Sequence, residues 1–374
     1  NSLPSPVARK DVASRGLFFN PPSPTTIANT RSFSTASTSR LLEGMIFDEK
    51  QGWLDRDLPV IDRPNFTKPG KKDGMLIAAR GVCAQTIQHA CESLGVKTFN
   101  LDIEGDTEQV KGKTTRVKTE GVGMNAVLDY EQLIKVCKQN NIKVVHLGWG
   151  GLSENYEAHT AFRKAGIWVV GPEPSRIKLM ADKITAKEVA IQAGFESTKN
   201  SKSTEDQNDI LKWVNDKKIK YPIIAKAKEG GGGKGIRIVK NKTELNKQFK
   251  EAQAEALASF GNNTMFAEEC IDQDKTRHKE IQSIGDVWGH GIELSQKRDC
   301  SMQDRGQKIL EETSVKLNRL EQGLLTKSDL IESIKYAGLG TLEYLDKMFM
   351  EMNTRVQVEH KVTENHYGIK LMEW

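Results

Sequence analysis

The strongest signal in the sequence is the segment Met350-Glu-Met-Asn-Thr-Arg-Val-Gln-Val-Glu-His360. Interpreted as a strand, it separates polar from apolar side chains, because successive residues of a strand point to opposite faces. Its polar face carries Glu351, Asn353, Arg355 and Gln357, and its apolar face carries Met350, Met352 and Val356. A buried polar row is costly without ligands, and carboxylate and amide oxygens are the ligands that Mg²⁺ prefers. The segment therefore predicts a metal-binding strand; the alternative is a solvated strand face.

A second acid is expected beside this strand. The preceding residues 340–345 also have the pattern of a strand, and Asp346-Lys347 suits a two-residue turn between the two strands. A short hairpin of this kind brings Glu343 close to Glu351. The two carboxylates together predict a site at which Mg²⁺ binds alongside substrate phosphates.

A glycine-rich loop, Glu229-Gly-Gly-Gly-Gly-Lys-Gly235, connects two further predicted strands at residues 221–226 and 236–239. Consecutive glycines allow backbone N–H groups to approach and cradle phosphate oxygens. The loop is neither a Walker A motif nor a GxGxxG dinucleotide turn, because no Ser or Thr follows Lys234 and a strand comes next instead of a helix. We expect a lid over a nucleotide; the alternative is an ordinary hairpin tip.

Basic side chains complete the predicted site. Lys226 ends the strand that leads into the glycine loop, where a buried ammonium needs an anion. Lys183 lies at the start of a helix expected over residues 182–193, which is unfavourable against the helix dipole unless the lysine faces a phosphate. Lys308 and His278 lie in the part of the chain dominated by strands, and His278 taken alone is more typical of an ordinary strand histidine.

The remaining sequence predicts an α/β fold. The strands expected in the first half are residues 75–79, 96–99 and 142–146, and they alternate with helical patterns such as residues 130–140. This alternation is typical of a parallel sheet covered by helices. Residues 243–257 predict a further helix with Thr243 as the candidate N-cap.

Composition excludes several classes of protein. The chain has 374 residues, which suggests two or three domains, and no stretch approaches the roughly 18 apolar residues of a membrane-spanning helix. A net charge of +5 and 6% aromatic residues give no reason to expect a nucleic-acid partner. Five scattered cysteines without a CxxC pair support neither a zinc knuckle nor a disulfide framework. Residues 1–42 are rich in Arg and Ser, which predicts a mitochondrial transit peptide or a disordered tail, and residues 43–70 are expected to form an extended arm.

These motifs resemble the biotin carboxylase component of biotin-dependent carboxylases, which are ATP-grasp enzymes. Matching segments occur in order within residues 73–374, at 77–81, 148–155, 181–183, 226–237, 277–282, 298–303 and 351–360. The resemblance implies an N-terminal extension, a Rossmann-like pre-ATP-grasp domain, an ATP-grasp lid and a partial ATP-grasp catalytic lobe, at residues 1–70, 71–197, 198–267 and 268–374. It also implies carboxylation of biotin by bicarbonate through carboxyphosphate, with ATP and Mg²⁺ (or Mn²⁺) and a separate biotin carrier. The composition of residues 1–42 separately predicts a location in the mitochondrial matrix.

The resemblance further implies roles for single residues. Nucleotide contacts are expected from Lys183, Lys226, Gly231, Gly232, Gly233, Glu268, Ile271, His278 and Gln303. The implied metal ligands are Glu343 and Glu351, with Asn353 beside them. The implied bicarbonate pocket consists of Arg355, Gln357 and Val358 with Lys308 nearby, and Glu359 is the implied general base.

Departures from the family pattern leave a second interpretation open. The family's Asn-Arg-Gly-Glu turn is Ala79-Arg-Gly-Val82 here, its His-Pro-Gly is His146-Leu-Gly148, and Gly306 stands where a histidine is expected. The chain also stops at Trp374, before the family's arginine that helps to hold biotin. The alternative is a catalytically impaired structural subunit of a mitochondrial assembly. In both cases we expect another subunit, or the arm around residues 45–69, to cover the edge near Trp374.

Overall fold

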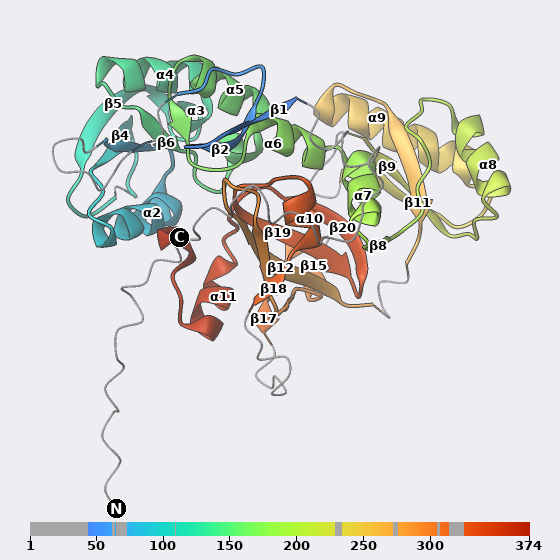
Figure 1. Ribbon diagram of the computed structural model, residues 1–374. Helices are drawn as coiled ribbons and strands as arrows, with labels where there is room; N and C mark the ends of the chain where they lie inside the picture. Colours follow the sequence, from blue (N-terminus) through green and yellow to red (C-terminus); the bar gives the residue numbers. More distant parts are fainter. Residues whose placement is uncertain are drawn as a thin grey trace, which may run out of the picture.

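A computed structural model describes residues 44–61, 64, 73–108, 110–228, 234–271, 276–304, 307–313 and 325–374. Three sheets organise these residues, and Figure 1 shows the N-terminal sheet on the left, a smaller sheet with its helices at the upper right, and the C-terminal sheet between and below them. No helix among the described residues combines the length and apolar character that crossing a membrane requires.

The N-terminal sheet is parallel, as the alternation of strands and helices predicts. Its strands, in sheet order, are β5 (Thr115–Val122), β4 (Thr98–Glu104), β3 (Met75–Ile77), β6 (Val144–His146) and β7 (Trp168–Val169). The helices around it are α2 (Gly81–Ser93), α3 (Asn125–Leu128), α4 (Tyr130–Gln139) and α5 (Tyr156–Lys164). All three residues of β3 are buried, which is why this short apolar run forms the central strand.

The smaller sheet is antiparallel and is packed by two helices. Its strands, in sheet order, are β10 (Ile236–Val239), β9 (Ile223–Ala227) and β11 (Met265–Glu269), and its helices are α8 (Gln207–Asp216) and α9 (Leu245–Phe260). We call this unit the lid. The predicted cap of α9 was wrong, because the helix begins at Leu245 without a side-chain cap. Thr243 instead donates its hydroxyl to Asn241 Oδ1 at 2.6 Å.

The C-terminal sheet has eight strands. Its main path is β17 (Glu312–Thr313), β14 (Arg298–Asp299), β12 (His278–Gly285), β19 (Gly338–Leu345), β20 (Met348–Asn353) and β8 (Glu196–Ser197). Off this path, β13 (Gly291–Leu294) pairs with β12, and β18 (Leu325–Lys327) pairs with β13. The neighbouring helices are α6 (Pro174–Ala181), α7 (Lys183–Gln192), α10 (Asp329–Ser333) and α11 (His360–Tyr367). The shorter elements are β15 (Gln303–Asp304), β16 (Gln307–Lys308), and the 3₁₀ turns η1 (Gly151–Glu154) and η2 (Leu371–Glu373).

The hairpin of β19 and β20 confirms the predicted turn and corrects one part of the strand prediction. Leu345 pairs with Met348 around Asp346 and Lys347, and Glu343 pairs directly with Glu351. Strand β20 ends at Asn353, however, so Arg355 and Gln357 do not continue its pleat. They lie in the connection to α11, where a turn and not strand alternation sets their direction.

The expected extended arm contains a β-hairpin. Strands β1 (Met45–Asp48) and β2 (Gly52–Asp55) pair antiparallel, which overturns that prediction for residues 45–55. The Trp53 N–H donates to the Val287 carbonyl at 2.8 Å, and Asp55 accepts from the Ser175 N–H at 3.0 Å. These contacts hold the hairpin against α6 and the β12–β13 turn. The hairpin therefore does not cover the edge near Trp374, where η2 packs against α2.

Candidate functional site

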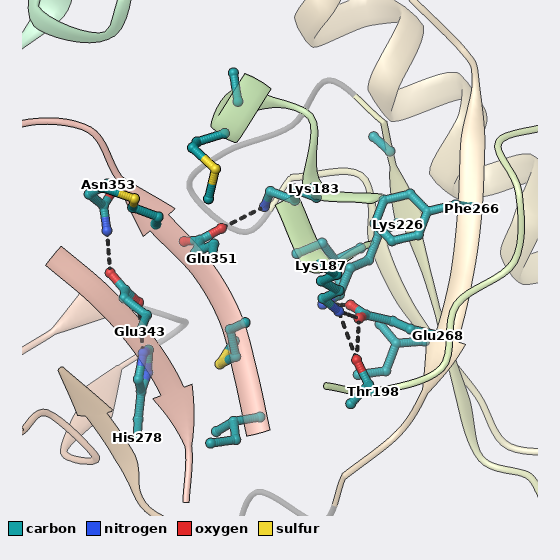
Figure 2. Close-up of a pocket in the computed structure, with 18 of the residues that line it drawn as sticks. Lys183, Lys187, Thr198, Lys226, Phe266, Glu268, His278, Glu343, Glu351 and Asn353 are labelled. Atoms are coloured by element: carbon teal, nitrogen blue, oxygen red, sulfur yellow. Dashed lines mark hydrogen bonds and ion pairs between the residues drawn. The ribbon is translucent and has the colours of Figure 1, made fainter. Parts of the chain in front are cut away.

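A cavity of about 550 Å³ lies between the lid, helices α6 and α7, and the β19–β20 hairpin (Figure 2). The predicted site residues that line it are Lys183, Lys226, Glu268, Ile271, His278, Gln303, Lys308, Glu343, Glu351 and Asn353. They come from α7, from lid strands and from the C-terminal sheet, which are distant in sequence. Motifs that were interpreted separately therefore meet at one cavity.

On the lid side, lysines gather around one buried acid. Lys226 of β9 and Lys187 of α7 both form ion pairs with Glu268 of β11, which is 2% exposed (Figure 2). The Thr198 hydroxyl donates to the same carboxylate at 3.1 Å. Burial and the charges of the neighbouring lysines lower the pKa of Lys226 to about 7 and that of Lys187 to about 8. The cluster therefore presents buried ammonium groups whose charged forms an added anion would stabilise.

On the opposite side, the two acids of the hairpin have different surroundings. Glu343 accepts hydrogen bonds from Asn353 Nδ2 at 2.7 Å and from Lys308 Nζ at 3.1 Å. Burial alone would raise the pKa of Glu343, but the hydrogen bond from His278 and the charge of Lys308 outweigh burial and lower it to about 2. Glu351 is 35% exposed and has Lys183 Nζ 3.3 Å from Oε2. Glu343 is thus a fixed, ionised carboxylate, and Glu351 is the accessible one.

The donor set of this hairpin fits a hard divalent cation. Glu343, Glu351 and Asn353 offer only oxygen ligands, and the first two are register partners on adjacent strands. Asn353 uses its amide N–H group on Glu343, which leaves its amide oxygen as an acceptor. The arrangement suits Mg²⁺ that binds together with phosphate oxygens.

His278 belongs to the acid side of the cavity. Its Nδ1 faces Gln303 Nε2 at 2.7 Å, and its Nε2 faces Glu343 Oε2 at 2.7 Å. Because the amide nitrogen of Gln303 is a donor, Nδ1 accepts and Nε2 carries the proton that is donated to Glu343. His278, a predicted nucleotide contact, therefore also orients the carboxylate of Glu343, a predicted metal ligand.

The residues of the expected bicarbonate pocket lie beyond the cavity wall, around the start of α11. Arg355 donates from Nε to Glu154 Oε2 at 2.7 Å, and Glu154 also accepts from the Thr354 N–H at 3.0 Å. Gln357 is buried and reaches Glu343 Oε1 from Nε2 at 3.4 Å, which joins this region to the metal side. Val358 is 58% exposed, and Glu359 immediately precedes α11.

A buried arginine contacts the same region. Arg298 is 1% exposed and donates to Glu280 Oε2 from Nη2 at 2.8 Å and from Nε at 3.1 Å. It also donates to Gln357 Oε1 at 3.1 Å and to the Thr363 hydroxyl of α11 at 2.9 Å. Arg298, which a buried ion pair with Glu280 holds in place, therefore fixes the position of Gln357.

Comparison with known proteins identifies the family. Residues 71–177 match the family described as the biotin carboxylase N-terminal domain, and residues 182–374 match the ATP-binding domain of the carbamoyl-phosphate synthase L chain. A biotin carboxylase from Nostoc sp. is 37% identical over 316 residues, which cover 81% of this chain and 69% of that protein. The chain belongs to the biotin carboxylase family.

Members of the biotin carboxylase family that resemble the chain include longer proteins. The mitochondrial pyruvate carboxylase of Rattus norvegicus is 36% identical over 318 residues, which cover 82% of this chain and 26% of that protein. The chain thus spans about a quarter of the length of this relative. The biotin carboxylase domain dimer of the Hydrogenobacter thermophilus 2-oxoglutarate carboxylase, solved with MgADP, ADP and bicarbonate, has a TM-score of 0.71 at 32% identity. That match covers 81% of this chain and 68% of the solved chain.

Three residues of the candidate site were missed from the sequence. Lys187 lies four residues after Lys183 on α7, and this spacing could have placed both on one helix face. Glu154 and Arg298 belong to segments that carried the family resemblance, but only the fold shows that they hold Arg355 and Gln357. The predicted nucleotide contacts Gly231, Gly232 and Gly233 lie outside the described residues.

Proposed function

We propose that the chain is the biotin carboxylase part of a biotin-dependent carboxylase, in which ATP and Mg²⁺ drive carboxylation of biotin by bicarbonate through carboxyphosphate. The observation that carries the proposal is one cavity with Glu343 and Glu351 on one side and lysines on the other. The acids favour a metal ion, and the ammonium groups favour phosphate. Because the two sets face each other across one cavity, the arrangement suits a nucleoside triphosphate.

Lys183 and Lys226 are proposed to bind phosphate oxygens. Both ammonium groups are paired with carboxylates, Lys183 with Glu351 and Lys226 with Glu268. A triphosphate brings the additional negative charge that a desolvated ammonium needs, so binding favours the charged form of Lys226. The end of β11, from Glu268 to Ile271, is proposed to contact the adenine.

The acid side is proposed to hold Mg²⁺ through Glu343, Glu351 and Asn353. When bound, the ion neutralises charge on the phosphates. The chain's own residues prepare this site, because His278 and Lys308 keep Glu343 ionised and fixed in direction. Gln303 in turn fixes the tautomer of His278.

Bicarbonate is proposed to bind between the start of α11 and Arg355, with Gln357, Val358 and Lys308 around it. A guanidinium presents a planar fork that matches a planar oxyanion, and Glu154 holds that fork through its Nε. Glu359 is proposed to remove the proton of bicarbonate as general base, so that the resulting oxyanion attacks the terminal phosphoryl group of ATP.

Biotin is proposed to arrive on a separate carrier protein or domain. Relatives of the chain are named as subunits or parts of larger carboxylases, such as the small subunit of a 2-oxoglutarate carboxylase and the alpha subunit of a methylcrotonoyl-CoA carboxylase. Further subunits are therefore expected beside the chain.

The substitution Glu359→Gln tests the proposed function. It should leave ATP affinity unchanged in calorimetry, because Glu359 is not among the residues that line the cavity. Bicarbonate-dependent ATP hydrolysis should fall by about 10²–10⁴-fold, the usual cost of losing a general base. Glu131→Gln, an exposed acid on α4, is the matched control and should retain full turnover.

Two results of this experiment would contradict the proposal. Unchanged bicarbonate-dependent turnover in the Glu359→Gln enzyme would remove the residue from its role. A native enzyme that neither binds ATP nor hydrolyses it with bicarbonate would instead favour the structural-subunit hypothesis.

A mitochondrial location is also proposed, with the matrix as the compartment. The Arg- and Ser-rich composition of residues 1–42 supports it, as does the mitochondrial designation of relatives from rat and mouse. A fluorescent protein fused behind residues 1–42 should be imported into mitochondria, and a diffuse signal would contradict the proposal.

A further inference from the structure

Glu311 is a buried acid that the proposed mechanism has not used. It lies immediately before β17, its side chain is 7% exposed, and neither of its carboxyl oxygens has a hydrogen-bond donor among the described residues. Helix α11 packs against β17, and the carboxyl group of Glu359 immediately before α11, the proposed general base, acts on that of Glu311 through its charge and a hydrogen bond that raise the pKa of Glu311. Two carboxylates in contact repel each other unless a proton lies between them.

The neighbouring cations do not neutralise this pair. Arg298 Nε lies 3.5 Å from Glu311 Oε2, but the same guanidinium is already bound at 2.8 Å to Glu280. Lys308 likewise pairs with Glu280 and lies 3.1 Å from Glu343 Oε1. These two cations therefore face four carboxylates in one partly desolvated region. One proton retained by the Glu311–Glu359 pair reduces this excess of negative charge.

A metal ion is a poorer explanation for the same cluster. Glu280, Cys300 and Glu311 each place one ligand atom within 4.8 Å of the others. Both oxygens of Glu280, however, already bind positive groups, Oε2 with Arg298 and Oε1 with Lys308. A cation in this position would be repelled by two resident positive charges, whereas a proton between Glu311 and Glu359 is not in conflict with them.

We propose that Glu311 is a positioning residue for the general base: it keeps a proton and donates it as a hydrogen bond to Glu359, which fixes the direction of the free Glu359 oxygen toward bicarbonate. This inference rests on the proposed function. In the reaction the O–H bond of bicarbonate breaks and an O–H bond to Glu359 forms, while Glu311 keeps its own proton. Glu359 later releases the proton it has gained.

The electrostatics of Glu311 agree with this role. Burial and the charge of Glu359 raise the pKa of Glu311 to about 7, although Arg298 and Lys308 act in the opposite direction. The groups that face Glu311 are Glu359 before α11, Arg298 and Cys300 near β14, Lys308 on β16 and Glu280 on β12. Glu311 is therefore protonated in weakly acidic solution and loses its proton as the pH rises through neutrality.

Two substitutions in the intact enzyme separate this role from simple packing. Glu311→Gln keeps a donor of the same shape that does not titrate, whereas Glu311→Leu removes the donor. At a fixed bicarbonate concentration, the Leu variant should lose about 10–100-fold in kcat/KM for bicarbonate while calorimetric ATP affinity stays unchanged. The Gln variant should remain within a few-fold of wild type and should lack the decrease that wild type shows above neutral pH. Glu312→Gln, an exposed neighbour on β17, is the control and should behave as wild type.

Infrared spectroscopy supplies a readout that does not depend on activity. Wild-type protein below pH 7 should show the carbonyl stretch of protonated carboxylic acids, to which Glu173, whose pKa burial raises to about 7, also contributes. The difference spectrum between wild type and Glu311→Gln should contain one such band, and the difference spectrum between wild type and Glu312→Gln should not. A missing band, or a folded Leu variant with full bicarbonate kinetics, would overturn the proposal. Equal losses in the Gln and Leu variants would also overturn it, because a retained donor of the same shape would then fail to preserve the function. A wild-type enzyme that shows the band but no bicarbonate-dependent hydrolysis would refute the proposed function and leave the proton-sharing pair in place.

Discussion

At the scale of single residues, Lys226 and Lys187 couple the site to pH. Their pKa values of about 7 and about 8 mean that both carry protons in the free enzyme below neutrality and lose them in alkaline solution. A triphosphate favours the charged forms, so binding raises both pKa values and takes up protons. ATP affinity should therefore fall between about pH 6.5 and about pH 8.5, by at most about tenfold per pH unit for each titrating lysine.

Calorimetry in two buffers of different ionisation enthalpy measures this proton uptake directly. Lys226→Met should weaken ATP binding by about 10–100-fold, which corresponds to the loss of one charge-assisted hydrogen bond, and should flatten the pH dependence. Lys220→Met, an exposed lysine before β9, is the control. Binding that is independent of pH in the wild type would show that these lysines do not contact the phosphates.

The residues that could be predicted from the sequence share one property: local pattern alone sets their place. Glu343 and Glu351 follow from a two-residue turn between two strands, and Lys183 follows from its position at the start of a helix. Glu154 could not be found in this way. Its partner Arg355 is about two hundred residues away in the chain, and only the packing of the N-terminal sheet against the C-terminal one brings the two together.

At the scale of elements, sequence patterns predicted the buried strands and failed for an exposed strand and for a turn. Strand β5 was not predicted, because most of its residues are exposed and its polar sequence gives no periodic signal. The turn after Asn353 was interpreted as continued strand, because alternation of polar and apolar residues persists beyond the last ladder pair. Its polar residues are directed by Arg298 and Glu154, which are tertiary partners and not part of the local pattern.

The β1–β2 hairpin offers a prediction at this scale. Buried Asp55 accepts from the backbone N–H and the hydroxyl of Ser175 and lies near the buried Arg176 guanidinium. Asp55→Ala leaves the backbone N–H and the hydroxyl of Ser175 without this acceptor, so the free energy of unfolding should fall by about 1–3 kcal/mol. Urea unfolding checks this result. Asp57→Ala, two residues later and exposed, should have little effect, and equal stability of the two variants would mean that the hairpin contributes nothing to the fold.

At the scale of the whole molecule, the site divides into two halves that different sheets support. Most lysines and acids of the cavity belong to the lid, to α7, to the C-terminal sheet and to the β15–β16 hairpin, and Glu154 of η1 also lines it. Arg355 is instead held from the N-terminal side, because Glu154 of η1 accepts from its Nε at 2.7 Å and from the Thr354 N–H at 3.0 Å. Nucleotide binding and bicarbonate binding are therefore expected to respond differently to a change in the N-terminal sheet.

Glu154→Gln should separate the two functions. The amide keeps the shape of the side chain and can still accept from Thr354, but it loses the charge that fixes the Arg355 guanidinium. We expect the KM for bicarbonate to rise by about 10-fold or more, the usual effect of losing a partner that orients a binding group. ATP affinity measured by calorimetry should change far less, because the Glu154 carboxylate lines the cavity but is bound to Thr354 and Arg355. Glu157→Gln on the exposed face of α5 controls for a general effect of removing charge from this region. If ATP affinity fell in parallel with bicarbonate affinity, the two sheets would act on the site as one unit. If neither changed, Arg355 would be held by its own turn, and the contact between the sheets would serve stability alone.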